Sequence, residues 1–168
     1  DLQNPVTLNV WNTYFSTGFG VAATQEHILF FPQSQLLRAI MPETKLVDYG
    51  IPLTDEQLAL GKRYDRAEFE ADLGKDLTEN QFEKSPAKKL WLSFAAGDEN
   101  RLNTYTQNAF KLGKDKFQFD SMLGLYLPED SKPIMRSLFF DRLRYRAGAN
   151  GYWGLGNDDA RLVGVASL

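Results

Sequence analysis

Helix-start signals fill the middle of this 168-residue chain, and strand-like segments lie on both sides of them. Thr54-Asp-Glu-Gln57 has the form of a capping box, in which the threonine hydroxyl and the glutamine side chain satisfy free backbone amides. Asp65-Arg-Ala-Glu68 repeats this pattern. Ser85-Pro86 places a capping residue before a proline, which suits the first helical position. We therefore expect a helical middle over about residues 54–113.

Two longer helices are predicted within this region. The segment from Pro86 to Ala96 is apolar nearly all round, which predicts deep burial; its large side chains are Leu90, Trp91, Leu92 and Phe94. Gly97-Asp98 ends this helix and begins the next. The second helix carries an apolar stripe and is expected to close at Gly113; the stripe is Leu102, Tyr105, Ala109 and Leu112.

The strand signals lie near the two ends of the chain. Residues 6–10 alternate apolar and polar side chains, and His27–Phe31 reads as a short buried strand ended by Pro32. Residues 162–166 form a credible final strand, and residues 134–146 fit a helix or a strand. Two further segments are read as a turn (residues 16–20) and as a brief helix capped by Ser34. The whole pattern predicts one α+β domain, residues 1–168, whose terminal strands form a mostly antiparallel sheet.

Composition excludes several classes of function. The net charge of -3 and the pI of about 5.2 argue against general nucleic-acid binding. The absence of cysteine excludes disulfides, thiolate metal sites, iron–sulfur clusters and cysteine nucleophiles. The apolar runs are too short for a membrane span. A chain that starts at Asp1 fits a processed bacterial protein, periplasmic or secreted, and equally a piece cut from a longer chain.

The charges are distributed unevenly along the chain. Residues 54–84 contain nine acidic and five basic side chains, whereas residues 132–161 contain six basic and three acidic ones. The two segments either complement each other, within the fold or across a dimer, or the acidic one is a solvated face.

Catalytic residues are few. His27 is the only histidine, so any histidine-dependent mechanism runs through it, although its place in an apolar strand favours a structural role. Glu68 and Asp72 are four residues apart and would share a helix face, where paired acids can divide acid and base roles, although the basic residues nearby favour a solvated charged face. Ser85-Pro-Ala-Lys88 matches the S-x-x-K nucleophile motif, but its companion motifs are absent and a helix cap explains it. A lone histidine cannot assemble the usual zinc sets, so we expect no metal and no cofactor.

The binding signals lie in the last quarter of the chain. Arg142, Arg144 and Arg146 alternate, so they would face one side of a strand or fan around a helix. On a strand they would form a surface whose guanidinium groups bind carboxylate or phosphate in a bidentate fork. A loop bracketed by Gly151 and Gly156 presents two aromatic side chains. The sequence predicts a ligand-binding or partner-binding surface made of Arg144, Arg146, Tyr152, Trp153 and Arg161.

We therefore expect a non-enzymatic binding domain that recognises a protein or a glycan. Two alternatives stay open. One is a small hydrolase of cell-envelope polymers that uses His27 or the Glu68 and Asp72 pair. The other is a structural subunit of a larger assembly, whose terminal strands pair with neighbouring subunits.

Overall fold

A computed structural model describes residues 15–32, 45–48, 50–152 and 161–162, with the backbone alone for 15–17 and 161–162. The strand predicted at residues 6–10, the helix after Ser34 and most of the final strand at 162–166 lie outside these residues.

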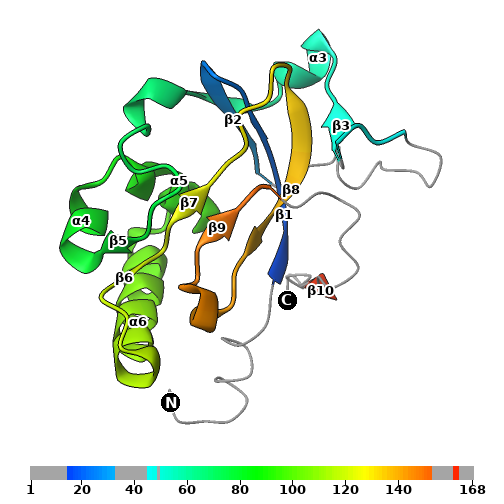
Figure 1. Ribbon diagram of the computed structural model, residues 1–168. Helices are drawn as coiled ribbons and strands as arrows, with labels where there is room; N and C mark the ends of the chain where they lie inside the picture. The colour runs from blue at the N-terminus through cyan, green and yellow to red at the C-terminus, as the bar shows by residue number, and fades with distance from the viewer. Residues whose placement is uncertain (1–14, 33–44, 49, 153–160, 163–168) are drawn as a thin grey trace.

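A curled sheet runs through the molecule, and its strands come mainly from the two ends of the chain (Figure 1). Its strand order is β4-β2-β1-β8-β9-β7, with β10 beside β1 and β3 beside β8. The pairs are antiparallel except β1 with β10 and β7 with β9. The strands are β1 (Phe15–Ala23), β2 (His27–Phe31), β3 (Ile51–Pro52), β4 (Lys62–Asp65), β7 (Leu125–Tyr126), β8 (Ile134–Phe140), β9 (Ala149–Asn150) and β10 (Arg161–Leu162). This arrangement confirms the predicted α+β class.

The turn predicted at residues 16–20 is wrong, because this segment is part of the central strand β1. Its glycines serve the sheet rather than a reversal of the chain. The pairing of β1 with β8 shifts register between Ser16 and Gly20, as at a β-bulge. A Cβ on Gly20 would lie 2.8 Å from Sδ of Met135, so glycine lets β1 approach that side chain.

The described residues contain four helices; the caps of three of them are predicted, whereas the helix from Glu79 follows a capping box at Thr78 that is not. They are α3 (Asp55–Leu58), α4 (Glu79–Lys84), α5 (Ala87–Phe94) and α6 (Glu99–Phe117). Thr54 and Gln57 form the predicted capping box, and Asp98 accepts from the backbone N–H of Arg101 to start α6. In the described ranges no helix combines the length and the apolar character needed to cross a membrane.

The helical middle is less continuous than predicted. It contains the strand β4 and the small pair of β5 (Leu77–Thr78) with β6 (Ser121–Met122). Asp65 caps only the 3-10 turn η1 (Arg66–Glu68), because the residues before it pair with β2 as a strand. Helix α6 passes Gly113 and ends at Phe117. Gly113 is buried beside Met122, whose Sδ would lie 2.2 Å from an added Cβ, so its role is close packing.

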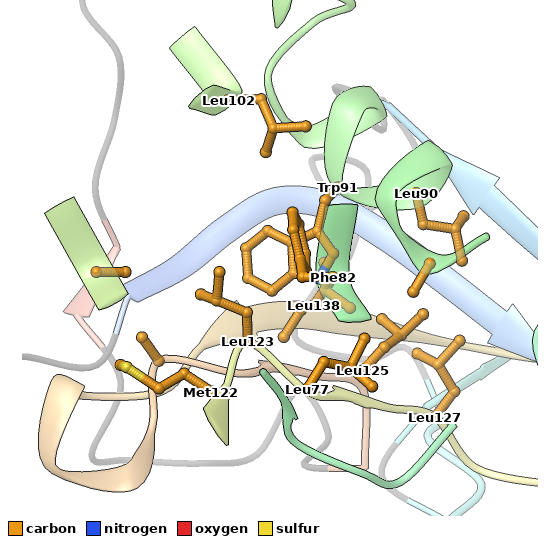
Figure 2. Packing of buried hydrophobic residues seen from close by; sticks show 14 of the residues in the cluster. Leu77, Phe82, Leu90, Trp91, Leu102, Met122, Leu123, Leu125, Leu127 and Leu138 are labelled. Carbon is orange, nitrogen blue, oxygen red and sulfur yellow. The ribbon is translucent and has the colours of Figure 1, made fainter. Parts of the chain in front are cut away.

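The main core lies between the sheet and the helices α4, α5 and α6 (Figures 1 and 2). Trp91 is its centre. The Trp91 ring stacks on Phe140 at 5.4 Å and on Tyr105 at 5.9 Å between ring centres. The deep burial predicted for the α5 segment holds for Leu90 and Trp91, whereas the other two large side chains of that segment are only partly buried.

The opposite face of the sheet carries a smaller core. Leu29, Phe31 and Met135 pack there against side chains from β3, α3 and the segment that joins them. Side chains alternate between the two faces along β1 and β2, as strand geometry requires. The sheet is therefore covered on both sides, although unequally.

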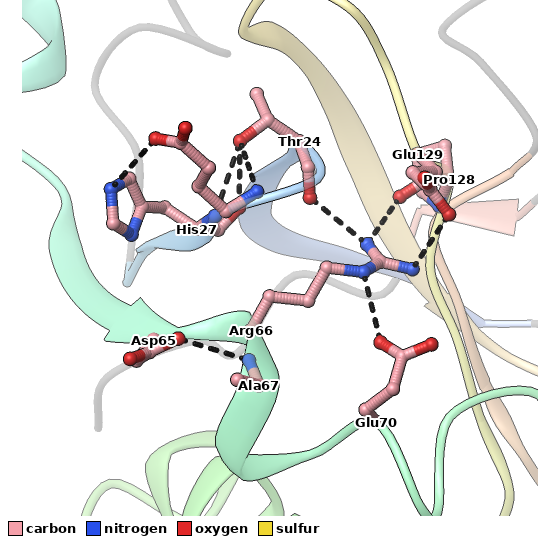
Figure 3. Close-up of polar contacts among 9 residues, drawn as sticks. Thr24, His27, Asp65, Arg66, Ala67, Glu70, Pro128 and Glu129 are labelled. Carbon is pink, nitrogen blue, oxygen red and sulfur yellow. Dashed lines mark hydrogen bonds and ion pairs between the residues drawn. The ribbon is translucent and has the colours of Figure 1, made fainter.

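Two buried arginines form hydrogen bonds and ion pairs with the loops beside the sheet. Arg66 donates to the backbone carbonyls of Thr24 at 3.2 Å and Pro128 at 2.9 Å, and pairs with the carboxylates of Glu70 and Glu129 (Figure 3). Arg136 of β8 forms a buried double contact with Asp130. Each guanidinium is satisfied by carbonyl or carboxylate oxygens, which offsets the cost of burying its charge.

Candidate functional site

The predicted arginines lie on a turn rather than a strand. Strand β8 ends at Phe140, and the 3-10 turn η2 (Leu143–Tyr145) follows. Arg142 precedes this turn, Arg144 lies in it, and Arg146 ends it in the left-handed backbone region with a φ of 66°. The expectation that the three arginines face one side of a strand is therefore wrong. Backbone hydrogen bonds from Tyr145 and Ala147 to Arg142 close the chain on itself at this point.

Arg146 is held by three kinds of contact. Its Nη1 donates to the carbonyl oxygen of Ser121 at 3.2 Å and to the hydroxyl at 2.9 Å. Its Nε lies 3.4 Å from Oδ2 of Asp76. Its guanidinium carbon lies 4.7 Å from the centre of the Phe119 ring. The side chain nevertheless remains 40% exposed, so these contacts orient the guanidinium at the protein surface.

Aromatic rings lie beside the guanidinium groups of Arg144 and Arg146. Phe119 stacks on Phe117 at 5.4 Å, and the guanidinium of Arg144 lies 4.8 Å from the ring centre of Tyr145. Phe117 and Tyr145 are 37% and 48% exposed, which is high for large apolar side chains. Helix α6 contacts η2, so both parts are close together. We call Phe117, Phe119, Arg144, Tyr145 and Arg146 the arginine–aromatic surface.

Asp76 contacts two residues at this surface, Tyr126 and Arg146. The hydroxyl of Tyr126 donates to its Oδ1 at 2.9 Å, while its Oδ2 faces Arg146. Burial, and then the hydrogen bond to Asp76, raise the pKa of Tyr126 well above its ordinary value, so the phenol stays a donor. The backbone of Gly124 passes so close that an added Cβ would lie 2.6 Å from the Tyr126 ring and 2.9 Å from Oδ1 of Asp76.

A second carboxyl group, Asp141, lies near Asp76. The pKa of Asp141 is raised to about 6: burial is the main cause, a hydrogen bond from Asn150 opposes the rise, and the charge of Asp76 adds to it. Asn150 also accepts from the backbone N–H of Tyr152 at 2.9 Å. The Asp141 carboxyl therefore connects the arginine–aromatic surface to the start of the Gly151–Gly156 loop.

The fold brings these groups together from distant parts of the sequence. Strands β7 and β9 pair in parallel with Tyr126 opposite Asn150, and β9 pairs with β8 just before Asp141. The N–H of Leu123 donates to the carbonyl of Arg146 at 2.9 Å. Leu123, Arg146 and Ala147 all have positive φ values, which side chains other than glycine rarely adopt. This concentration of backbone strain is typical of functional sites.

The loop residues of the predicted binding surface are only partly described. Tyr152 is 58% exposed and lies close in sequence to Asn150. Trp153 lies outside the described residues. Arg161 is described by its backbone, which pairs with β1 in parallel. The structure therefore brings Arg144 and Arg146 onto one turn and leaves the contribution of Trp153 and Arg161 as a prediction.

Each of the predicted catalytic residues contacts a different partner. His27 lies at the start of β2, with its Nε2 3.6 Å from Oε2 of Glu26 (Figure 3). Glu68 pairs with Lys89 at 3.1 Å, and Asp72 accepts a hydrogen bond from the hydroxyl of Ser85. The expectation that Glu68 and Asp72 share a helix face is wrong, because η1 ends at Glu68. The Ser85 hydroxyl accepts from the N–H of Ala87 at 2.9 Å and so caps α5, as the helix-cap interpretation predicts.

The described residues contain no group of three or more histidine, aspartate or glutamate side chains placed to hold a metal ion. Comparison with protein-family models, with curated protein sequences and with solved structures found no match.

Four of the residues around the site are not predicted from the sequence. Asp76, Tyr126, Asp141 and Asn150 carry no local motif, because their proximity depends on the pairing of β7, β8 and β9. A weak signal exists in Gly124 and Gly148, which lie two positions before Tyr126 and Asn150. Both glycines are buried against the Tyr126 ring.

Proposed function

We propose that this chain is a non-enzymatic binding domain that recognises a carboxylate-bearing protein or glycan through the arginine–aromatic surface. Tyr152, Trp153 and Arg161 are proposed to extend the contact. One observation carries the proposal: the guanidinium carbon of Arg146 lies 4.7 Å from the centre of the Phe119 ring, and Asp76 and Ser121 hold the side chain, which still stays 40% exposed.

The chemistry of this arrangement suits an anionic ligand. Because Nη1 and Nε of Arg146 face Ser121 and Asp76, Nη2 is the nitrogen that can donate a charge-assisted hydrogen bond to a carboxylate. The exposed faces of Tyr145 and Phe117 offer apolar area beside the charge. Arginine and aromatic residues are the types most enriched where binding energy is concentrated in interfaces. Asp76 and the strained backbone fix Arg146 before binding, which lowers the entropy lost on association.

The test is binding to defined polymers. Poly-L-glutamate represents an acidic protein and polygalacturonate an acidic glycan, while dextran is the neutral control. We expect saturable binding of one of the acidic polymers at low salt, weakened by added salt. The double variant Arg144→Gln/Arg146→Gly should bind at least about tenfold more weakly, the factor that corresponds to about 1.4 kcal/mol. Arg101→Gln, at the other end of α6, is the matched control and should bind like wild type. An equal loss of affinity in the double variant and in Arg101→Gln would contradict the proposal.

A second function is favoured by one specific observation, the neighbouring carboxyl groups Asp76 and Asp141. Asp76 faces Arg146 and Tyr126, while burial raises the pKa of Asp141 to about 6. Two carboxyl groups in unlike environments can divide the roles of base and acid in hydrolysis. This version of the hydrolase alternative predicts that the protein releases reducing ends from a cell-envelope glycan and that Asp141→Asn stops the release. If the wild-type protein releases no reducing ends from purified peptidoglycan, this hydrolase alternative is wrong and binding remains the one proposed function.

A further inference from the structure

A cavity of about 500 Å³ lies on the face of the sheet opposite the main core, away from the groups of the arginine–aromatic surface. Its wall is formed by β2, β4, α3 and the residue before β8. The volume falls within the range of pockets that hold small organic ligands.

Strand register sets one wall of the cavity. Leu29 and Arg63 are directly opposite each other in the antiparallel pair of β2 and β4, so their side chains rise from the same face. His27 lies two residues before Leu29 and also lines the cavity. Leu29 belongs to the smaller core, which makes it a fixed apolar floor beside the charged group of Arg63.

Helix α3 provides the facing wall. The capping box of Thr54 and Gln57 fixes the first turn, which contains Asp55. Leu58 packs against the smaller core, and Asp55 and Leu58 both line the cavity. The cavity thus has an apolar floor, with an acidic group on one wall and a basic group on the other.

Among the residues that the structure describes, the side chains of Asp55 and Arg63 have no polar partner. Neither Asp55 nor Arg63 forms an ion pair or a side-chain hydrogen bond, with each other or with any residue in the part of the chain that the structure describes. Lys62 and Glu56, their sequence neighbours, do not line the cavity. A pocket with separated, unpaired charges of opposite sign is complementary to a ligand that carries both charges.

We infer that this cavity binds a small zwitterion of dipeptide size, with its ammonium group at Asp55 and its carboxylate at Arg63. The side chains of the ligand contact Leu29 and Leu58. The imidazole of His27 lies in the same wall as Arg63 and contributes a further polar contact. This inference concerns a different surface from the proposed function, so either can fail without the other.

The test uses a dipeptide and its blocked forms on the full chain. L-Alanyl-L-leucine is titrated into isotope-labelled protein, and the amide signals of Leu29, Leu58, Ala59 and Gly61 are followed by NMR. We expect saturable shifts at these amides. N-acetylated and C-amidated versions, each lacking one charge, should bind about tenfold more weakly. Absence of saturable shifts at these amides, or equal binding of the blocked forms, would overturn the inference.

Variants assign each end of the ligand. Asp55→Asn should remove the difference between the free and the acetylated dipeptide, and Arg63→Gln the difference between the free and the amidated one. Glu56→Gln and Lys62→Gln, which make the same changes of charge next to the cavity, should bind like wild type. Equal effects in these controls would show attraction by net charge alone and overturn the assignment. If a variant fails to fold, the blocked ligands on wild type still decide the outcome.

Discussion

Arg146 combines an unfavourable backbone with favourable side-chain contacts. Its φ of 66° costs a residue with a Cβ about 1 kcal/mol, which glycine would not lose. Its ring contact, its partly exposed ion pair and its hydrogen bonds to Ser121 together contribute about 1–2 kcal/mol. We therefore predict that the free energy of unfolding of Arg146→Gly lies within about 1 kcal/mol of the wild-type value, while its affinity for an acidic ligand falls. Urea unfolding beside the binding assay checks this. A loss of stability well beyond that range would mean that Arg146 is mainly structural.

Asp141 makes the stability of the fold depend on pH. Its pKa is raised to about 6, so the folded state holds the proton more tightly than the unfolded chain. This contribution is complete below the unfolded pKa near 3.8 and disappears as pH rises through about 6. The full shift corresponds to about 3 kcal/mol, and partial exposure reduces this to about 1 kcal/mol.

Asp141→Asn should therefore be more stable than wild type by about 1 kcal/mol at about pH 8, with the difference vanishing at about pH 4. Urea midpoints at the two pH values measure this. Asp115→Asn, at an exposed position on α6, is the control and should show no such gain. A gain for Asp141→Asn that is independent of pH would contradict the assigned cause.

At the scale of elements, β7 is positioned by close contact around Gly124. An added Cβ would lie 2.9 Å from the carbonyl oxygen of Lys75 and equally close to Oδ1 of Asp76. Gly124→Ala should therefore cost about 1–3 kcal/mol of unfolding free energy, because backbone must move. It should also weaken acidic-ligand binding by displacing Asp76. Gly18→Ala, where nothing lies within 4 Å, is the control; equal midpoints for the two variants would contradict the packing argument.

Helix α5 begins at the hydroxyl of Ser85. This hydroxyl accepts from the N–H of Ala87 and donates to Asp72. Ser85→Ala should lower the unfolding free energy by about 1 kcal/mol, which is typical for loss of a cap. It should leave binding of acidic polymers unchanged. Lys88→Met, which alters the other residue of the S-x-x-K pattern, should have a smaller effect. If both variants abolished a hydrolytic activity, the pattern would be a nucleophile motif after all.

The sequence predicts features of the fold that depend on neighbours along the chain. Thr54, Ser85 and Asp98 start helices as expected, because a cap needs only the next two or three residues. The glycines of β1 were misread as a turn, since their purpose is contact with β8 far away in sequence. Arg144 and Arg146 were identified from their spacing, but the site around them requires the parallel pairing of β7 with β9. No local pattern contains that information.

At the scale of the whole molecule, the two proposed binding sites lie on different parts of the fold. The main core and its helices hold the arginine–aromatic surface, whereas the smaller core holds the cavity beside α3. The chain has a net charge of -3, so attraction of an acidic ligand must come from the local arrangement of arginines. This makes the position of the bound ligand a stricter test than its affinity.

The most direct measurement is therefore hydrogen exchange with and without the acidic polymer that binds, at low salt and neutral pH. We expect added protection in two segments, residues 117–126 and 142–152, with little change in β2, β4 and α3. Protection centred instead on another basic region, such as the groove that Lys62 and Lys89 line, would contradict the proposed function. So would binding without any local protection.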